Sequence, residues 1–175
     1  MRKKQLLFFF LCIFMAVLTG CQSDKTDISK SEDDKFVRVY FTNEEGNDLV
    51  YEERREVEGK DNQSKVDDMI DWMLEEPEEE DHYVAIPNEV VINNVVARNN
   101  VVNIDFAVGY ESMDKAKDVI CRAAIVRTLV QIKGIDFVEF SIGGKTMMDS
   151  DNTPIGSLTA DSFVFGELPM EVKEE

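Results

Sequence analysis

The residue with the clearest chemical context is Cys21, which comes directly after an apolar segment. Leu18 and the small residues Thr19 and Gly20 precede it, an order that is similar to a bacterial lipobox. The small residues fit a signal peptidase, and the cysteine thiol supplies the nucleophile that takes up diacylglycerol before cleavage. The sequence therefore predicts lipidation of Cys21. The alternative is an ordinary signal peptide that is followed by a cysteine by chance.

The segment before Cys21 has the layout of a secretory signal. Three basic residues open it, and an apolar stretch over residues 6–17 follows, which is shorter than the ~20 residues of a membrane-spanning helix. We expect residues 1–20 to be removed. Residues 21–35 then form the lipidated cysteine and a disordered tether, because this stretch is polar and holds no aromatic residue. Two acyl chains, at about 0.8 kcal/mol per buried methylene, would anchor the protein on the extracytoplasmic face of the bacterial cell membrane.

The mature chain is strongly acidic. The full sequence has 19 Lys and Arg against 36 Asp and Glu, a net charge of −17. Removal of the signal takes three positive charges and no negative ones, which leaves −20 over 155 residues. Such a charge argues against nucleic acid as a partner and against lying flat on anionic lipid. It is compatible with a basic protein partner, and the length suits one domain with its own core.

Carboxylates are numerous, but they do not mark a metal site. The range Glu75–Asp81 holds six of them around Pro77. Because consecutive carboxylates in a loop repel one another, we interpret this range as a solvated acidic loop. His82 is the only histidine, so a zinc site has no second imidazole from which to be built.

Two other candidate positions are rejected on residue type. Asp149 and Asp151 resemble the opening of a calcium loop, but Pro154 stands where glycine is needed and Ala160 where the closing glutamate would be. Cys121 is the one thiol left in the mature domain and lies on a helical apolar stripe, so it is predicted to be a small buried hydrophobe. The sequence thus predicts no catalytic residue, no metal and no cofactor.

The chain is organised around a predicted helix that leads at once into a strand. Residues 115–132 carry two apolar stripes at helical spacing, which indicates a helix that is mostly buried. Gly134 follows where a left-handed backbone lets the chain turn back. Residues 135–142 then alternate between apolar and other side chains, the period of a strand. This unit lays a helix across a sheet.

The remaining predicted elements are strands and one amphipathic helix. In chain order the strands cover residues 36–41, 49–57, 90–106 as a hairpin, 145–148 and 162–165. The hairpin turns at Asn99-Asn100, which sets Ala97 opposite Val102, Val95 opposite Ile104 and Asn93 opposite Phe106.

A helix that precedes the hairpin is predicted to start at a Ser64 cap and to end before Pro77. Its apolar face consists of Val66, Met69, Ile70, Met73 and Leu74. The fold class is therefore α+β, an α/β sandwich with two helices on a small mixed β-sheet. We expect one domain over residues 36–166 and a loose acidic tail over 167–175.

Six short segments, taken in their order along the chain, carry a family resemblance. They are Val39–Phe41, Leu74–Pro77, Ala85–Val90, Val101–Phe106, Arg127–Leu129 and Gly134–Gly144. Together they resemble the GerMN domain, the module named from bacterial sporulation and spore germination proteins. The resemblance implies a compact α/β fold similar to the ring-building modules of envelope assemblies, with no known catalytic activity. Such domains occur in lipoproteins and transenvelope complexes; the family's sporulation protein carries two copies, and this chain has room for one.

Two functions from different classes follow as expectations. The first is a lipid-anchored, non-catalytic assembly module of the cell envelope that docks on another envelope protein through a sheet edge or a helix face. It is motivated by the second apolar stripe of the 115–132 helix, which needs a cover from a partner or from the first helix. The alternative is a lipoprotein that binds the cell wall or a small ligand, which requires a concave pocket. An enzyme is not predicted, because no pair of carboxylates is singled out.

Overall fold

The computed structural model describes residues 36–55 and 61–163. All of them belong to one compact unit of the chain. Lipidation of Cys21, the signal, the tether and the acidic tail are predictions on residues outside the described ones. Within the described part of the chain, no helix is both long and apolar enough to cross a membrane.

The fold is α+β, as predicted, and its described residues form two helices and two sheets. In chain order the elements are β1 (Phe36–Thr42), β2 (Leu49–Arg55), α2 (Asn62–Leu74), β3 (Ile92–Arg98), β4 (Val101–Phe106), the 3-10 turn η2 (Tyr110–Ser112), α3 (Lys115–Leu129), β5 (Phe137–Ile142), β6 (Lys145–Thr146) and the 3-10 turn η3 (Ala160–Ser162).

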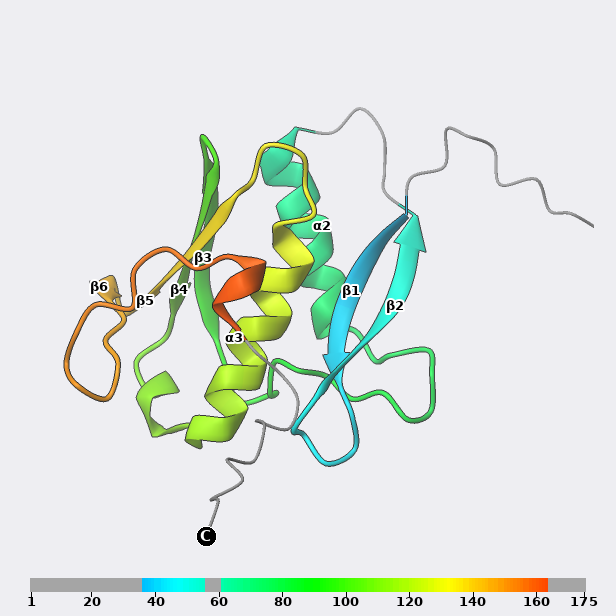
Figure 1. The fold of residues 1–175 in the computed structure, drawn as a ribbon, viewed down its shortest axis with the longest axis horizontal. Helices are drawn as coiled ribbons and strands as arrows, with labels where there is room; N and C mark the ends of the chain where they lie inside the picture. The colour runs from blue at the N-terminus through cyan, green and yellow to red at the C-terminus, as the bar shows by residue number, and fades with distance from the viewer. Residues whose placement is uncertain (1–35, 56–60, 164–175) are drawn as a thin grey trace, which may run out of the picture. The chain divides into compact units, whose positions relative to one another are not determined.

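The two sheets differ in their pairing. Strands β1 and β2 form an antiparallel hairpin, and the other strands form a sheet in the order β3-β4-β5-β6. In that sheet β4 and β5 are parallel and the other pairs are antiparallel. The parallel pair follows from the α3 crossover that joins its two strands. Figure 1 shows the two helices between the β1–β2 hairpin and the four-stranded sheet.

The described strands form two sheets rather than the single small sheet expected, because Thr128 of α3 and Gln131, just after the helix, cover the outer edge of β1. The Arg38 backbone N–H donates to Gln131 Oε1 over 2.9 Å, and Gln131 Nε2 donates back to the Arg38 carbonyl over 2.7 Å. The Tyr40 N–H donates to Thr128 Oγ1 over 3.1 Å. Side chains from the end of α3 and from the turn after it thus stand where the backbone of a third strand would otherwise pair.

A second glutamine covers the outer edge of β3 in the same way. From α2, Gln63 accepts the Ala97 N–H at Oε1 over 2.7 Å and donates from Nε2 to the Val95 carbonyl over 3.1 Å. A strand edge whose N–H and C=O groups are already paired cannot extend onto another chain. These two stretches of edge are therefore excluded as docking sites.

Replacing Gln131 with alanine is expected to lower the free energy of unfolding by about 1 kcal/mol. The loss is modest because Gln131 is exposed, so water can reach the freed Arg38 groups. Urea unfolding measures it, with Lys133→Ala as a control at an exposed neighbour whose change should stay within about 0.5 kcal/mol. Equal losses in both variants would contradict a role for the edge contact.

The core lies where α3 meets the other elements. As predicted, this helix is mostly buried: all its residues from Ile120 to Val126 are buried, and so are Thr128 and Leu129. On the predicted stripes, Val130 is half-buried, and Val119 is exposed over 41% of its surface. The stripes are thus covered inside the chain over most of their length, and the uncovered end is confined to the first turns of α3.

Several local predictions are wrong for identifiable reasons. Helix α2 is capped by Asp61 and not by Ser64; the Asp61 carboxylate accepts the Ser64 N–H over 2.8 Å, which also lowers the pKa of Asp61. Leu74 is 49% exposed, because it is the last residue of the helix and Met73 is the last on its buried face. Helix α3 ends at Leu129 instead of Ile132, since the chain tightens there into an i to i−3 hydrogen bond.

Two strand predictions also need correction. The hairpin register holds for Ala97 with Val102 and for Val95 with Ile104, but Ile92 and not Asn93 lies opposite Phe106. A bulge displaces Asn93, whose side chain donates to Asp105 Oδ2 and to the Phe106 carbonyl. The last strand is predicted to start at Ser162, but Ser162 is the last residue of the η3 turn. Residues 164 and 165 of that predicted strand lie outside the described part.

Candidate functional site

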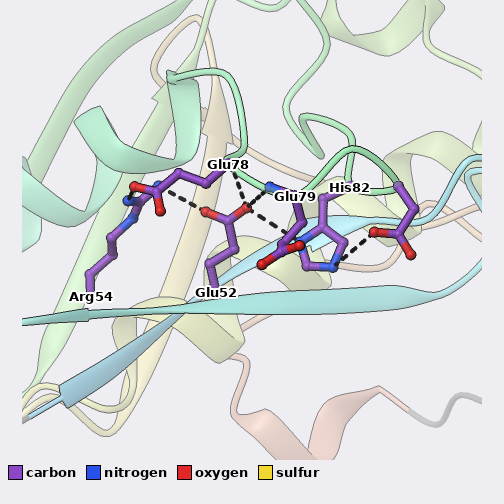
Figure 2. A network of polar contacts seen from close by, with 6 residues as sticks. Glu52, Arg54, Glu78, Glu79 and His82 are labelled. Carbon is purple, nitrogen blue, oxygen red and sulfur yellow. Dashed lines mark hydrogen bonds and ion pairs between the residues drawn. The ribbon is translucent and has the colours of Figure 1, made fainter.

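The first polar cluster that the fold assembles is centred on Glu52 of β2. Its Oε1 accepts the backbone N–H groups of Glu78 and Glu79 over 2.7 and 3.0 Å, and its Oε2 accepts from Arg54 Nη2 over 2.8 Å. Arg54 also pairs with Glu78. Figure 2 shows the Glu52 carboxylate between Arg54 on one side and His82 on the other. The oxygens of Glu52, which is only 8% exposed, are therefore already engaged.

This cluster anchors the acidic loop instead of forming a reactive centre. The six acidic side chains of residues 75–81 are exposed, as predicted for a solvated loop. His82 lies over the Phe41 ring, with its Nδ1 3.4 Å from Glu52 Oε1. In residues 36–55 and 61–163, no three His, Cys, Asp or Glu side chains are placed to hold a metal ion. The alternation of β2 could have revealed the anchor, since Glu52 and Arg54 lie directly opposite the buried Val39 and Val37 of the partner strand.

The second polar cluster joins the η2 turn to the first half of α3. Tyr110 donates its hydroxyl proton to Asp118 Oδ1 over 2.8 Å. Arg122, one turn further along the helix, donates from Nε to Oδ1 over 2.8 Å and from Nη2 to Oδ2 over 2.6 Å. This bidentate ion pair is partly buried, with the Arg122 side chain 11% and the Asp118 side chain 24% exposed. No hydrogen bond to Arg122 Nη1 is formed by the described part of the chain.

Burial dominates the ionisation of this cluster. Burial, with the nearby Cys121 and Asp118, raises the pKa of Tyr110 well above its usual range. Burial also raises the pKa of the Cys121 thiol to about 12. Burial by itself lowers the pKa of the Arg122 guanidinium, because it disfavours the charged form. Hydrogen bonds and charge attraction to Asp118 outweigh this effect, so the pKa of Arg122 is raised. At neutral pH the tyrosine and the thiol are therefore neutral, and Cys121 behaves as the buried hydrophobe predicted.

The buried thiol predicts a loss of stability in alkali. Its pKa rises from the ordinary 9.0 to about 12 on folding, so the stabilisation is complete below pH 9.0 and is lost as the pH rises toward 12. Over that window the free energy of unfolding should fall by up to about 1.4 kcal/mol per pH unit. Urea unfolding at several pH values between 9.0 and about 12 measures the slope of the free energy of unfolding against pH. Cys121→Ala should make it shallower, leaving the share due to Tyr110, and identical slopes in the two proteins would disprove the assignment.

A cleft of about 610 Å³ opens beside this second cluster, between the start of α3 and the segment that follows β6. Its apolar wall is formed by Met113, Val119, Ile142, Met147, Met148, Pro154 and Ile155. Its polar residues are Tyr110, Glu111, Lys115, Asp118, Arg122, Asp149 and Ser150. The Asp149 carboxylate accepts the N–H groups of Asp151 and Thr153, so it closes its own turn.

A second hollow, of about 270 Å³, adjoins the cleft and shares Tyr110 and Met113 with it. It is lined further by Glu89, Val90, Val91, Ala107, Val108, Gly109, Ser112, Asp114 and Lys117. We call the two together the joined hollows. Of the eight most exposed large apolar side chains in the described residues, four line them: Val91, Val108, Val119 and Met148. This gathering of exposed apolar side chains makes the joined hollows the candidate functional site.

Reasoning from the sequence missed this site. Its spacing places Val119 on an apolar stripe that is predicted to be buried, and the pattern of residues 107–113 predicts no helix or strand. Neither carries a motif, and the hollows are formed by residues from four separate stretches of chain. The one available signal was local: the sequence Met147-Met148 ends the predicted edge strand 145–148, where an apolar pair has to face either the core or a ligand.

Comparison with known proteins identifies the domain. The family described as "Germane: Sporulation and spore germination" matches residues 38–147, a span that runs from β1 to the residue after β6. The chain belongs to the Germane family. This family is associated with sporulation and spore germination and is not a known class of enzyme. The GerMN resemblance predicted from the six segments is thus confirmed.

Solved structures confirm the fold of this Germane domain. The tandem GerMN domains of the sporulation protein GerM from Bacillus subtilis match with a TM-score of 0.57 at 16% identity, covering 78% of this chain and 51% of that one. The first GerMN domain of the same protein matches with a TM-score of 0.55 at 17% identity, covering 74% of this chain and 99% of that one. This chain therefore spans about half of the tandem protein.

The solved structure described as "Putative Lipoprotein from Clostridium perfringens" is similar at a TM-score of 0.41 and 17% identity, over 65% of this chain and 78% of that one. That score is too low to support a statement about this Germane domain. No curated protein matches the chain.

Proposed function

We propose that this protein is a lipid-anchored, non-catalytic interaction module of the bacterial cell envelope. In this proposal Cys21 carries the lipid, the tether of residues 21–35 holds the Germane domain clear of the membrane surface, and the domain docks on another envelope protein. The process would be sporulation or germination, with which the family is associated.

The observation that carries the proposal is the joined hollows. A soluble domain rarely exposes a contiguous apolar surface without a use for it. Here four exposed apolar side chains surround two adjoining depressions, although the core beneath them is complete. The surface replaces the second stripe of α3 as the argument for a partner, since that stripe is covered by the chain itself.

The first experiment is a crosslinked pull-down of the lipidated protein from intact cells, with proteins and glycans identified in the eluate. We expect one near-stoichiometric envelope protein, recovered with wild type and lost with Cys21→Ala. Recovery of glycan alone, without a protein, would overturn the proposal and support a cell-wall binding lipoprotein.

The volume of the larger cleft favours a second candidate function, the binding of a small ligand. About 610 Å³ lies within the range of small-molecule sites, and Arg122 and Tyr110 converge on its polar side. A small ligand would raise the midpoint of thermal unfolding of the purified domain in proportion to the logarithm of its concentration. A screen of wall fragments and small carboxylates by thermal unfolding therefore separates the two functions, since only the second predicts a shift without a protein partner.

A further inference from the structure

We propose that the joined hollows bind an amphipathic segment of another protein, with large apolar side chains on one face and Lys or Arg beside them. This inference rests on the proposed function and names the surface and the chemistry of the partner. It has two independent supports, the apolar lining of the hollows and the charge of the chain.

The lining favours apolar side chains of irregular shape. Three methionines, Met113, Met147 and Met148, lie in the larger cleft, and Met113 also lies in the smaller hollow. The unbranched thioether side chain adapts to the shape of a bound group, and it is common on surfaces that receive apolar segments. The two hollows share a wall at Tyr110 and Met113, so one continuous ligand can place side chains in both.

The rigid side of the site is provided by α3. The ion pair between Asp118 and Arg122 fixes the first turns of this helix against Tyr110. Val119, between the two charged residues, is 41% exposed and lines the larger cleft. On the other side Met148 is 48% exposed and lies in the segment after β6. A partner segment seated between these two side chains would remove both from water.

Charge selects the partner. The chain carries a net charge of −17, so a second copy or any acidic segment is repelled at long range. The lining of the hollows is itself net acidic: it holds the five carboxylates of Glu89, Glu111, Asp114, Asp118 and Asp149 against the three basic side chains of Lys115, Lys117 and Arg122. Lysines or arginines on the flanks of the apolar segment would meet these carboxylates, which raises the rate of association and disfavours acidic competitors.

Three synthetic helical peptides test the two supports separately. The first presents leucine on one face and lysine on the other, the second has the same leucines with glutamate in place of lysine, and the third has the same lysines with serine in place of leucine. Binding to the purified domain is measured by fluorescence anisotropy, and the site is mapped by amide chemical shifts. We expect the Leu/Lys peptide to bind at least about tenfold more tightly than either other peptide.

Three substitutions that leave the net charge unchanged locate the binding site of the peptide. Val119→Ser and Met148→Ser each remove an exposed apolar side chain from the hollows, and Leu74→Ser removes one of similar exposure that lies outside them. Because all three positions are exposed, the variants should keep the thermal unfolding midpoint of wild type. We expect the Val119→Ser/Met148→Ser double variant to bind the Leu/Lys peptide about tenfold more weakly, and Leu74→Ser to bind it as wild type does.

Several results would overturn the inference. If the Ser/Lys peptide bound as tightly as the Leu/Lys peptide, charge alone would account for the binding. If the Leu/Glu peptide bound as tightly as the Leu/Lys peptide, the requirement for a basic partner would be refuted. Equal weakening by Leu74→Ser would place the contact elsewhere. In the pull-down, an envelope partner that is still captured by the double variant leaves the proposed function intact and rejects this surface. Peptide binding to the hollows without any captured cellular partner would support this surface and reject the proposed function.

Discussion

Asp118→Asn is expected to lower the free energy of unfolding by about 3 kcal/mol, the largest stability effect we predict for a single polar substitution in this domain. The substitution removes the negative charge that pairs with Arg122, whose side chain is 11% exposed. A buried guanidinium without its counterion has lost its hydration and has no charged partner in exchange. Tyr110 also loses a charged acceptor for its hydroxyl proton. Urea unfolding of the purified domain measures the change.

A double variant and a matched control test the reason for this loss. Adding Arg122→Met to Asp118→Asn removes the unpaired charge, so the double variant should regain a large part of the stability. Asp136→Asn is the control: Asp136 is exposed and accepts a hydrogen bond from Asn100, so its change should stay within about 0.5 kcal/mol. If the double variant were less stable than Asp118→Asn, the cost would come from lost packing and not from an unpaired charge.

Cys21→Ala is expected to move the protein from the membrane fraction to the soluble or secreted fraction almost completely. In the proposed function the anchor is diacylglycerol on the Cys21 thiol, and without two acyl chains the remaining chain has little affinity for a membrane. With its net charge of −17 the chain would also be repelled by anionic headgroups. Cell fractionation and the mass of the mature N-terminus measure the result.

The matched control for this prediction is Cys121→Ala. It also removes one thiol, but that thiol is buried in the core and does not reach a lipid-transferring enzyme. The Cys121→Ala protein should therefore stay in the membrane fraction. The mass of the N-terminus separates the two ways in which a Cys21→Ala protein could stay on the membrane. A retained protein that still carries residues 1–20 is held by its uncleaved signal. A retained protein from which residues 1–20 have been removed would disprove Cys21 as the anchor.

The sequence alone predicted those features that depend on neighbours along the chain. The alternation of residues 36–41 predicted β1, and the helical spacing of Val66, Met69, Ile70 and Met73 predicted the buried face of α2. Asn99 has a positive φ of 56°, as the turn at Asn99-Asn100 requires, and the pairing close to that turn is the predicted one. The register failed only at Asn93, where a bulge that the periodicity does not encode shifts the strand by one residue.

Only the tertiary structure decided which distant groups meet. Gln131 binds Arg38 across 93 positions of sequence, and Glu52 accepts from Glu78 and Glu79 across 26 and 27. A glutamine on a helix has the same local pattern whether it faces water or the edge of a strand, so no periodicity distinguishes the two. The same holds for Val119, whose place on an apolar stripe predicted burial although nothing in the described chain covers it fully.

The domain's family could be inferred from the order of short segments, because that order is a property of the chain that the sequence displays directly. The candidate site could not, because its shape is a relation between surfaces. The hollows exist where the η2 turn, the start of α3 and the segment after β6 come together without filling the space between them. Whether apolar side chains fill such a space or leave it open depends on packing in three dimensions, which local sequence patterns do not specify.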